Sequence, residues 1–414
     1  MTATSKNMDR RLDLDWIRIG ALALLILYHV GMVYVPWDWH VKSPRLLDWL
    51  QPVMVLTNPW RLTLLFIVSG AATRFMLDRA AATPFLKARL IRLTPPLLFG
   101  MLVIVPPQTW LQLADAGTSL PYDQFYAAYL TAGGDWRWHG APLTTPTWNH
   151  LWFVVYILVY TMLLAGTVAI GRRLPAAWRR AGEPLARLPL WLGLVLIPIL
   201  YLTGVRLVLA PVYPETHALF GDWTVHAESL AAFLFGFGTA RSARVWRALA
   251  AWRRRLLGLA IFAYAIYAGS LILWMTGTAD AALAKAVMHS VYGLDQYGWT
   301  ATILGYAHQY LARAEHPARA YLTQAIFPWY LVHQTLIIMA AVALRRFTLP
   351  IAVEAALILT ATVGGCVLFY ELARRVGWLR VLTGLKPHPA ATARPIPRSP
   401  HGSCAPERPS GTAW

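Results

Sequence analysis

Apolar runs of about 20 residues recur along this chain, and they constrain its fold more than any other feature. A run of this length crosses the roughly 30 Å hydrocarbon core of a bilayer as one helix. We therefore predict an all-α polytopic membrane protein with about ten transmembrane helices. The predicted spans are 17–35, 58–77, 92–111, 151–170, 188–209, 227–240, 256–276, 286–311, 324–344 and 351–372, of which the sixth is short and the eighth is polar in its middle.

The composition supports a membrane protein and argues against several other classes. Only 14% of the residues are charged, whereas soluble chains carry about 25%. The net charge of +18 would suggest nucleic acid in a soluble chain, but here the basic residues cluster between apolar runs, so we expect no nucleic-acid partner. Two isolated cysteines, Cys366 and Cys404, and histidines without ligand spacing predict no metal site, and we expect no bound cofactor.

The basic residues also predict the orientation of the chain. If the N-terminus is inside, the segments that face inward carry far more Lys and Arg than the outward segments. This asymmetry places both termini in the cytoplasm of a multi-pass inner (plasma) membrane protein. The first run lacks a small-residue cleavage site and is predicted to be a retained helix. We expect one membrane domain, 1–385, followed by a disordered cytoplasmic tail, 386–414, which has no apolar period.

Three ionisable residues in the first helix form the first candidate constellation, because charge inside a bilayer is costly and usually functional. Arg18 and His29 are eleven residues apart, so they share a face about 16 Å apart along the axis. Asp15 and Arg18 lie where the helix leaves the cytoplasm, and His29 lies toward the outside. Histidine can take a proton from an attacking hydroxyl, which makes His29 a candidate general base. The alternative is an imidazole that only bonds neighbouring helices.

A second constellation, Arg89 and Arg92, begins the third predicted helix at its inner end. Arginines at i and i+3 share a helix face and bind phosphate bidentately, as a coenzyme A donor would require. The alternative is ordinary anchoring of the inner membrane face. On the second predicted helix, Ser69 and Gly70 leave room for a thin acyl or pantetheine chain, although close helix packing also explains them.

Polar residues of the outer half form a third group, which can converge with His29 on an acceptor pocket or pair with one another. The connection from Leu113 to His150 is rich in Trp and Tyr, which suit stacking on sugars or an interfacial aromatic belt. The acceptor-side candidates are His150, Trp152, Glu228, His289, Asp295 and His333.

The ordered set of these motifs resembles the integral membrane acyltransferase family 3 from about Leu12 to Leu382. The resemblance rests on Leu14-Asp15-Trp16-Ile17-Arg18 with His29, on Phe66-x-x-Ser69-Gly70 and on Arg89-x-x-Arg92. Within that family, three further motifs are most similar to glucan biosynthesis C proteins, which attach succinyl groups to periplasmic glucans. These motifs are Trp39-His40-Val41-Lys42-Ser43, His150-Leu151-Trp152-Phe153 and Tyr330-Leu331-Val332-His333.

The resemblance implies that His29 and Arg18 occupy the positions of the catalytic pair, and that Arg89 and Arg92 bind the donor. We therefore expect an O-acyltransferase that moves an acetyl or succinyl group from cytoplasmic acyl-coenzyme A to a periplasmic glycan or glucan, in contact with membrane lipid. This reaction predicts a continuous path from the three arginines to His29. A secondary transporter or exporter and a non-catalytic envelope scaffold are the competing interpretations.

Overall fold

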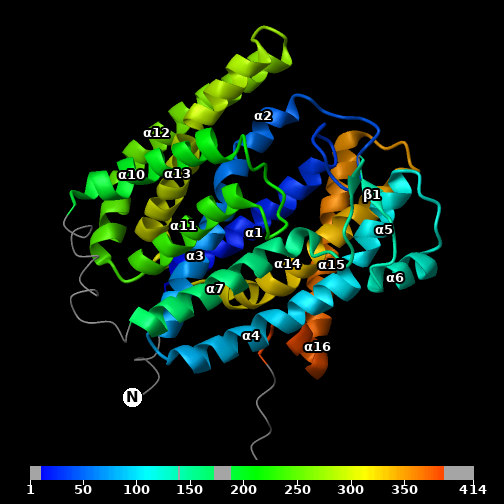
Figure 1. The fold of residues 1–414 in the computed structure, drawn as a ribbon, viewed down its shortest axis with the longest axis horizontal. Helices are drawn as coiled ribbons and strands as arrows, with labels where there is room; N and C mark the ends of the chain where they lie inside the picture. Colours follow the sequence, from blue (N-terminus) through cyan, green and yellow to red (C-terminus); the bar gives the residue numbers. More distant parts are fainter. Residues whose placement is uncertain (1–10, 139, 172–187, 387–414) are drawn as a thin grey trace, which may run out of the picture.

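One central helix organises the bundle in the computed structural model, which describes residues 11–138, 140–171 and 188–386. Helix α1 (Leu12–Met32) packs against α3 (Asn58–Leu77), α13 (Ala281–Leu311) and α14 (Pro317–Leu344) (Figure 1). The stretch 19–27 of α1 consists of Gly, Ala, Leu and Ile, and apart from its one glycine these residues favour a buried helix. We call the turn of α1 that holds Arg18 the arginine end and the turn that holds His29 the histidine end.

The remaining elements are almost all helical. The other α-helices are α2 (Leu50–Val55), α4 (Ala82–Phe99), α5 (Pro106–Asp115), α6 (Tyr122–Leu130), α7 (Trp152–Gly171), α10 (Ile197–Gly204), α11 (Trp223–Thr239), α12 (Ala243–Met275), α15 (Ile351–Arg375) and α16 (Gly377–Leu382). Short π-helical turns are Gly100–Ile104, Leu192–Leu196 and Val205–Leu209, and a 3-10 turn is Asn149–Leu151. Strands β1 (Arg137–Trp138) and β2 (Ala141–Pro142) pair antiparallel. The predicted all-α class is confirmed.

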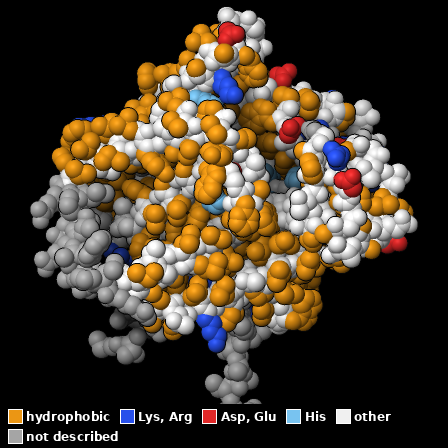
Figure 2. All heavy atoms as spheres, viewed as in Figure 1, with side chains coloured by type: hydrophobic (Ala, Val, Ile, Leu, Met, Phe, Trp, Pro, Cys, Tyr) orange, Lys and Arg blue, Asp and Glu red, His pale blue; other side chains and the backbone are white. Residues whose placement is uncertain are grey.

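Eight helical segments in the described part of the chain are long and apolar enough to cross a membrane. They are Leu12–Met32, Leu50–Leu77, Ala82–Asp115, Asn149–Gly171, Leu192–Leu209, Ala243–Met275, Pro317–Leu344 and Ile351–Arg375. Figure 2 shows hydrophobic side chains over most of one face of the molecule, with few charged groups. Hydrocarbon, rather than water, is a suitable solvent for such a surface. The chain is a multi-pass membrane protein.

The two other predicted spans are helical, but their helices are not among those that are both long and apolar enough to cross a membrane. The run 227–240 falls largely within α11, which has only 17 residues. The run 286–311 falls within α13, which has 31 residues and buries Asp295 and Gln296. Helix α11 packs on α3, and α13 packs on α10 and α12. Neighbouring helices therefore cover polar surfaces of α13, such as Asp295 and Gln296, that would be costly to expose to lipid.

Some helices begin well before the predicted apolar runs. Helix α12 starts at Ala243 and includes Arg253 and Arg254, which the prediction left outside the span at 256–276. Arginine is a good helix former, and the Ser242 hydroxyl caps the helix by accepting from the Val245 N–H. The prediction followed hydropathy, which marks the hydrocarbon boundary and not the helix end. Of the predicted tail, 387–414 lie outside the described residues.

The predicted aromatic connection between Leu113 and His150 contains α6 and the β1–β2 hairpin. Leu113, Phe125 and Tyr129 are buried together, and Trp110 and Trp136 pack against them. Much of the aromatic surface of this connection is therefore used in its own small core.

Candidate active site

A cavity of about 550 Å³ opens at the histidine end of α1. Its walls come from α1, α3, α7, α11, α13 and α14 and from the loops that join helices at this end. Polar and aromatic side chains in the lining include His29, Arg61, His150, Trp152, Arg206 and Glu228. The cavity thus collects side chains that are far apart in the sequence.

His29 is held by a second histidine behind it. Its Nδ1 lies 3.0 Å from Nε2 of His333, and the two rings are stacked with centroids 5.1 Å apart. Nδ1 of His333 lies 2.8 Å from the backbone carbonyl oxygen of Tyr330. Since a carbonyl oxygen only accepts, Nδ1 of neutral His333 carries the hydrogen and its Nε2 accepts from Nδ1 of His29. The lone pair of His29 is therefore on Nε2, the ring nitrogen that His333 does not occupy.

The same reasoning assigns the ring hydrogen of His150, which lies on the other side of His333. Its Nε2 lies 3.0 Å from the carbonyl oxygen of Leu331, so Nε2 is the donor. Its Nδ1 then accepts from the Gln108 amide, whose nitrogen lies 3.4 Å away. The ring centroids of His150 and His333 are 5.3 Å apart at nearly a right angle. The histidine cluster therefore has one consistent pattern of protonated and unprotonated nitrogens.

A glutamine network extends this cluster to the loop that follows α1. The Gln334 amide nitrogen donates to Oε1 of Gln108 at 3.1 Å and to Nε2 of His40 at 2.8 Å. Nδ1 of His40 donates to Oε1 of Gln112 at 2.5 Å. Burial lowers the pKa of His40, although its hydrogen bond with Gln112 opposes this effect. His40 therefore fits the network as a neutral imidazole.

Lys42 fastens the same loop to the end of α1. Its Nζ donates to the carbonyl oxygens of Met32 at 2.7 Å and Val35 at 2.8 Å. These are the kind of unpaired carbonyls that end a helix. Burial lowers the pKa of Lys42 to about 8, against the opposing charge of Asp38. The loop that holds His40 is thus anchored next to His29.

A second loop, 210–222, closes the opposite wall. The Asp222 carboxylate accepts from the backbone N–H groups of Thr216 at 3.1 Å and His217 at 3.0 Å. The His217 ring lies 4.2 Å from the Trp152 ring, centroid to centroid, and its carbonyl accepts from Nε1 of Trp148. These contacts give the cavity an aromatic wall whose position is fixed by a buried carboxylate.

The opposite end of α1 gathers positive charge. Arg89 is buried, and its Nη2 donates to the Thr73 hydroxyl at 2.9 Å. The charges of Arg92 and Arg18 both act on the Arg89 guanidinium, so the three side chains form one cluster. Within the described ranges no carboxylate pairs with Arg89, and its buried Nε has no hydrogen-bond acceptor. Such a cluster is suited to an anionic ligand.

Comparison with known proteins identifies a family whose match extends over both clusters. A family model described as "Acyltransferase domain" matches residues 11–371, which include both the histidine cluster and the arginine cluster. The chain belongs to this acyltransferase family.

Curated relatives of the acyltransferase are named Glucans biosynthesis protein C. The protein from Shigella dysenteriae serotype 1 is 27% identical over 157 residues, which cover 37% of this chain and 38% of the relative. The protein from Escherichia coli strain K12 is 25% identical over 162 residues, with the same coverage of both chains. The match thus spans about two fifths of the relatives' length. No solved structure gives a significant match.

The structure of the acyltransferase brings some predicted acceptor-side residues together and separates others. His150, Trp152 and Glu228 line the cavity with His29. His333 lies behind His29 and is fully buried, so it does not belong to the acceptor wall. His289 and Asp295 are not among the lining residues. Both are on α13, whose cavity face carries Tyr292 and Gln296. Asp295 is adjacent to Gln296 and therefore turned about 100° away from that face, whereas His289 precedes Tyr292 by three residues, about 4.5 Å along the helix axis.

Asp15 and Arg18 occupy the arginine end, away from the cavity. The Asp15 carboxylate pairs with Nη1 of Arg319 at 2.9 Å and ties α1 to α14. His29 lies fourteen residues further along the helix, about 21 Å at 1.5 Å per residue. The side chains of Asp15 and Arg18 therefore do not reach His29 in this conformation, and their catalytic roles stay predictions.

Gly70 has a packing role and does not open a channel. A Cβ atom at Gly70 would lie 1.9 Å from the carbonyl oxygen of Phe233, and one at Gly236 would lie 2.0 Å from that of Ile67. Only glycine permits this crossing of α3 and α11. The Ser69 carbonyl accepts from the Thr73 hydroxyl at 2.8 Å, so Ser69 supports the residue that holds Arg89. The structure thus supports the packing explanation for Gly70, and the donor-side role of Ser69 and Gly70 stays a prediction.

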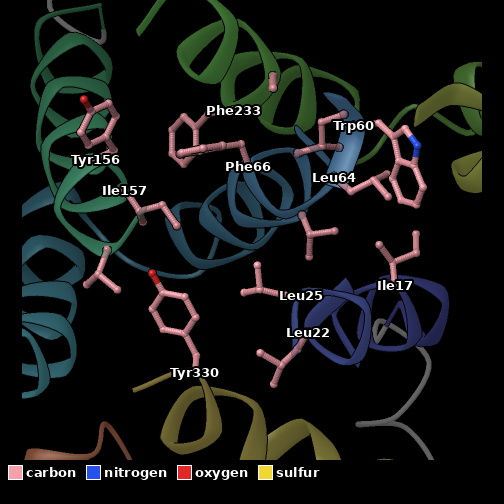
Figure 3. Packing of buried hydrophobic residues seen from close by; sticks show 14 of the residues in the cluster. Ile17, Leu22, Leu25, Trp60, Leu64, Phe66, Tyr156, Ile157, Phe233 and Tyr330 are labelled. Carbon is pink, nitrogen blue, oxygen red and sulfur yellow. The ribbon is translucent and has the colours of Figure 1, made fainter. Parts of the chain in front are cut away.

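The predicted passage between the two ends is not part of the cavity. Leu22 and Leu25 lie on the stripe of α1 between Arg18 and His29, and both are buried. Figure 3 shows them among the packed side chains that include Phe66 and Tyr330. Leu25 lines the cavity, but none of the three arginines does. The packed leucines therefore separate the arginine cluster from the histidine cavity.

Sequence reasoning missed several cavity residues. Arg61 lies in an apolar run, so the cost of an intramembrane charge was a signal that had no assigned role. His217 and Glu215 are in a loop with no motif, and only the fold brings them to the cavity. Gln334 follows His333 directly and becomes informative only through its bonds to His40 and Gln108. Within the described ranges no group of His, Cys, Asp or Glu has the geometry to hold a metal ion.

Proposed function

We propose that this protein is an O-acyltransferase of the inner membrane that uses acyl-coenzyme A from the cytoplasm to acylate a hydroxyl of a periplasmic glycan. The observation that carries the proposal is the His29–His333 pair at the edge of a cavity, with the lone pair on Nε2 of His29. An acyl transfer to an alcohol needs a base of this kind within reach of the hydroxyl.

In the proposed reaction, Nε2 of His29 takes the proton of the acceptor hydroxyl while its oxygen attacks the thioester carbonyl carbon. The carbon–sulfur bond then breaks, the new ester bond remains, and the proton passes from His29 to the departing thiolate. His333 stabilises the imidazolium through the hydrogen bond at Nδ1 and keeps the ring oriented. The products are the acylated glycan and free coenzyme A.

The donor's phosphates are assigned to Arg18, Arg89 and Arg92. Their shared positive field supports this assignment, because coenzyme A carries a pyrophosphate and a 3′-phosphate. The pantetheine arm has the length to follow α1 toward His29, about 16 Å away from Arg18. In this mechanism Leu22 and Leu25 move aside when the donor binds, and they keep water and protons from crossing when it is absent.

The acceptor is proposed to be a glucan-like sugar that carries the receiving hydroxyl. Aromatic faces at Trp39, Trp148 and Trp152 line the cavity and suit sugar rings. The relatives named Glucans biosynthesis protein C support the same acceptor class. Acetyl and succinyl groups are both proposed as acyl substrates.

The topology proposed is ten transmembrane helices with both termini in the cytoplasm. The excess of Lys and Arg in segments at the arginine end supports this orientation. Helices α11 and α13 supply the two spans beyond the eight that meet the apolar criteria. The histidine cavity then faces the periplasm and the arginine cluster faces the cytoplasm.

The test is transfer by the purified protein in sealed vesicles of defined orientation. Acetyl- or succinyl-coenzyme A, labelled in the acyl group, is supplied on the arginine side and a glucan on the histidine side. We expect labelled glucan and one free coenzyme A thiol per transfer. No label on the glucan with either donor, in a protein that is correctly inserted, would contradict the proposed function.

A further inference from the structure

Arg61 is a buried cation without an anionic partner. Its residue is only 3% exposed, and it lines the cavity from the first turns of α3. Among the residues described here no carboxylate lies within ion-pair distance, and Nε and Nη1 have no hydrogen-bond acceptor. The guanidinium carbon lies 3.6 Å from the centre of the Tyr28 ring. A phenol ring holds the plane of the guanidinium but does not neutralise its charge, and Nε and Nη1 remain without an acceptor.

The other arginine of the cavity shows what a paired cation looks like. Arg206 contacts Glu215 at 2.5 Å and Glu228 at 2.8 Å. Arg61 instead lies over the ring of Tyr28, and Tyr292 lines the same cavity; phenols are neutral at pH 7 and supply no counter-charge. Two of the cavity carboxylates, Glu215 and Glu228, thus pair with Arg206 and not with Arg61, although all of these side chains line one cavity.

Further donors lie beside Arg61. The Tyr28 hydroxyl donates to Oδ1 of Asn58 at 3.0 Å. The amide oxygen of Asn58 is thus occupied, and its amide nitrogen can donate to another group. Asn58 also lines the cavity and starts α3, where the helix dipole adds partial positive charge. A guanidinium, an amide and a helix start are together matched to a small oxyanion.

We propose that Arg61 and Asn58 form a subsite for an anionic group, a carboxylate or a phosphate, carried by a substrate in the cavity. This inference rests on the proposed function, since the subsite selects among substrates of the transfer. The anion comes either from the far end of the acyl group, as in a dicarboxylic acyl donor, or from a charged substituent of the glycan. In either case Arg61 is a specificity-determining residue, and His29 acts on every substrate alike.

Matched substrates distinguish the two sources. The donors are succinyl-coenzyme A and butyryl-coenzyme A, which has the same number of acyl carbons without the carboxylate. The acceptors are a neutral glucan and the same glucan bearing phosphoglycerol groups. Arg61→Gln is expected to lower kcat/KM by about 10- to 100-fold only where the substrate is anionic, because the substitution removes a charged hydrogen bond. Arg61→Lys is expected to restore part of that loss.

If Arg61→Gln lowers kcat/KM only with the succinyl donor, the anion belongs to the acyl group. If it lowers kcat/KM only with the charged glucan, the anion belongs to the acceptor. Equal loss with all four combinations, or no loss with any, overturns the subsite. Tyr28→Phe serves as the control, because it keeps the ring under Arg61 and removes only the hydroxyl that bonds Asn58. It is expected to cost less than Arg61→Gln.

A binding measurement keeps the subsite testable if transfer fails. Free succinate and neutral succinamide are titrated against the wild type and Arg61→Gln in detergent, followed by tryptophan fluorescence, because Trp39, Trp148 and Trp152 line the cavity. We expect succinate binding to the wild type alone. Binding without any transfer would refute the proposed function and retain the subsite. Transfer without a difference between wild type and Arg61→Gln in binding or in substrate preference would support the proposed function and refute the subsite.

Discussion

The histidine cluster and the arginine cluster, at opposite ends of α1, differ in how their polar groups are satisfied. At the histidine end, His29, His333 and His150 have assigned donors and acceptors, and the glutamine network extends the pattern. At the arginine end, the three arginines that form one cluster include Arg89, whose buried Nε lacks an acceptor. A pre-paired group is ready to act on a reacting atom, whereas unmatched charge is completed by a ligand. The difference supports the proposal that chemistry takes place at one end and that the donor binds at the other.

Replacing His29 should have the largest effect, because it removes the proposed general base at the histidine end. We expect His29→Ala to lower kcat by about 10²- to 10⁴-fold while the protein still inserts. His289→Ala is the matched control, since His289 does not line the cavity. Acyl transfer and membrane insertion are measured for both. Near-normal transfer by a well-inserted His29→Ala protein would remove the chemical role from this end.

The partner of His29 should be the next most sensitive position. In His333→Leu, Nδ1 of His29 loses its acceptor, so the ring can turn and change tautomer. We expect kcat to fall by up to about 10²-fold with little change in KM. His333→Gln offers an oxygen acceptor near the original Nε2 and should recover part of the rate. If Gln and Leu are equally harmful and KM rises in both, His333 has only a packing role.

The crossing between α3 and α11 is closely packed at Gly70 and Gly236 and should resist enlargement. Gly70→Ala places a methyl group on the Phe233 carbonyl, and overpacking of this kind costs about 1–3 kcal/mol. Gly238→Ala on α11 is the control, because a Cβ there meets nothing within 4 Å. Thermal unfolding in detergent compares them. A Gly70→Ala protein as stable as Gly238→Ala would show that the space at Gly70 is open and would revive its role beside the donor.

Removing the arginine cluster should weaken donor binding more than chemistry. We expect the double variant Arg89→Ala, Arg92→Ala to raise the KM for acyl-coenzyme A by about tenfold or more, because it loses charged hydrogen bonds to phosphate. Lys87→Ala removes an exposed charge from the same helix and should leave KM unchanged. Equal effects of both changes would reduce the arginines to membrane anchors and abolish the contrast between the two ends.

The helical architecture was predictable because its cause is local. Runs such as 58–77 and 351–372 had to be long and apolar to cross a bilayer, and α3 and α15 occupy them. The start of α12 was missed because arginine continues a helix beyond the hydrocarbon, so hydropathy does not mark its end.

The site was predictable only in part, for a different reason. His29 and Arg18 had a signal because both are ionisable residues on one helix face. The partner of His29 is 304 residues away, and no local rule states that His333 lies behind His29 and not across the cavity. The same holds for His217, whose contact with Trp152 depends on how Asp222 folds its loop. Tertiary packing, which a single sequence does not display, decides these positions.

The smallest expected effect concerns pH, and it involves His40 at the histidine end. The folded protein holds His40 neutral, since Nδ1 donates to Gln112 and Nε2 accepts from Gln334. Burial lowers its pKa, and the charge of Lys42 acts in the same direction. In the unfolded chain His40 titrates near pH 6.5. Below that pH the unfolded state therefore binds a proton that the folded state does not, and the free energy of unfolding falls as the pH drops toward the folded pKa.

We expect the wild type to lose more thermal stability between pH 7.5 and pH 5.5 than His40→Gln does, because glutamine removes this titration while it keeps a donor and an acceptor. Thermal unfolding of both proteins in detergent at the two pH values measures the difference. Lys87→Gln at the arginine end serves as the control and should follow the wild type, since lysine does not titrate in this range. If the wild type and His40→Gln lose the same stability, the neutral network at His40 does not distinguish the two ends. A larger loss in His40→Gln would mean that His40 binds a proton more tightly in the folded state, the reverse of what its burial and its partners require.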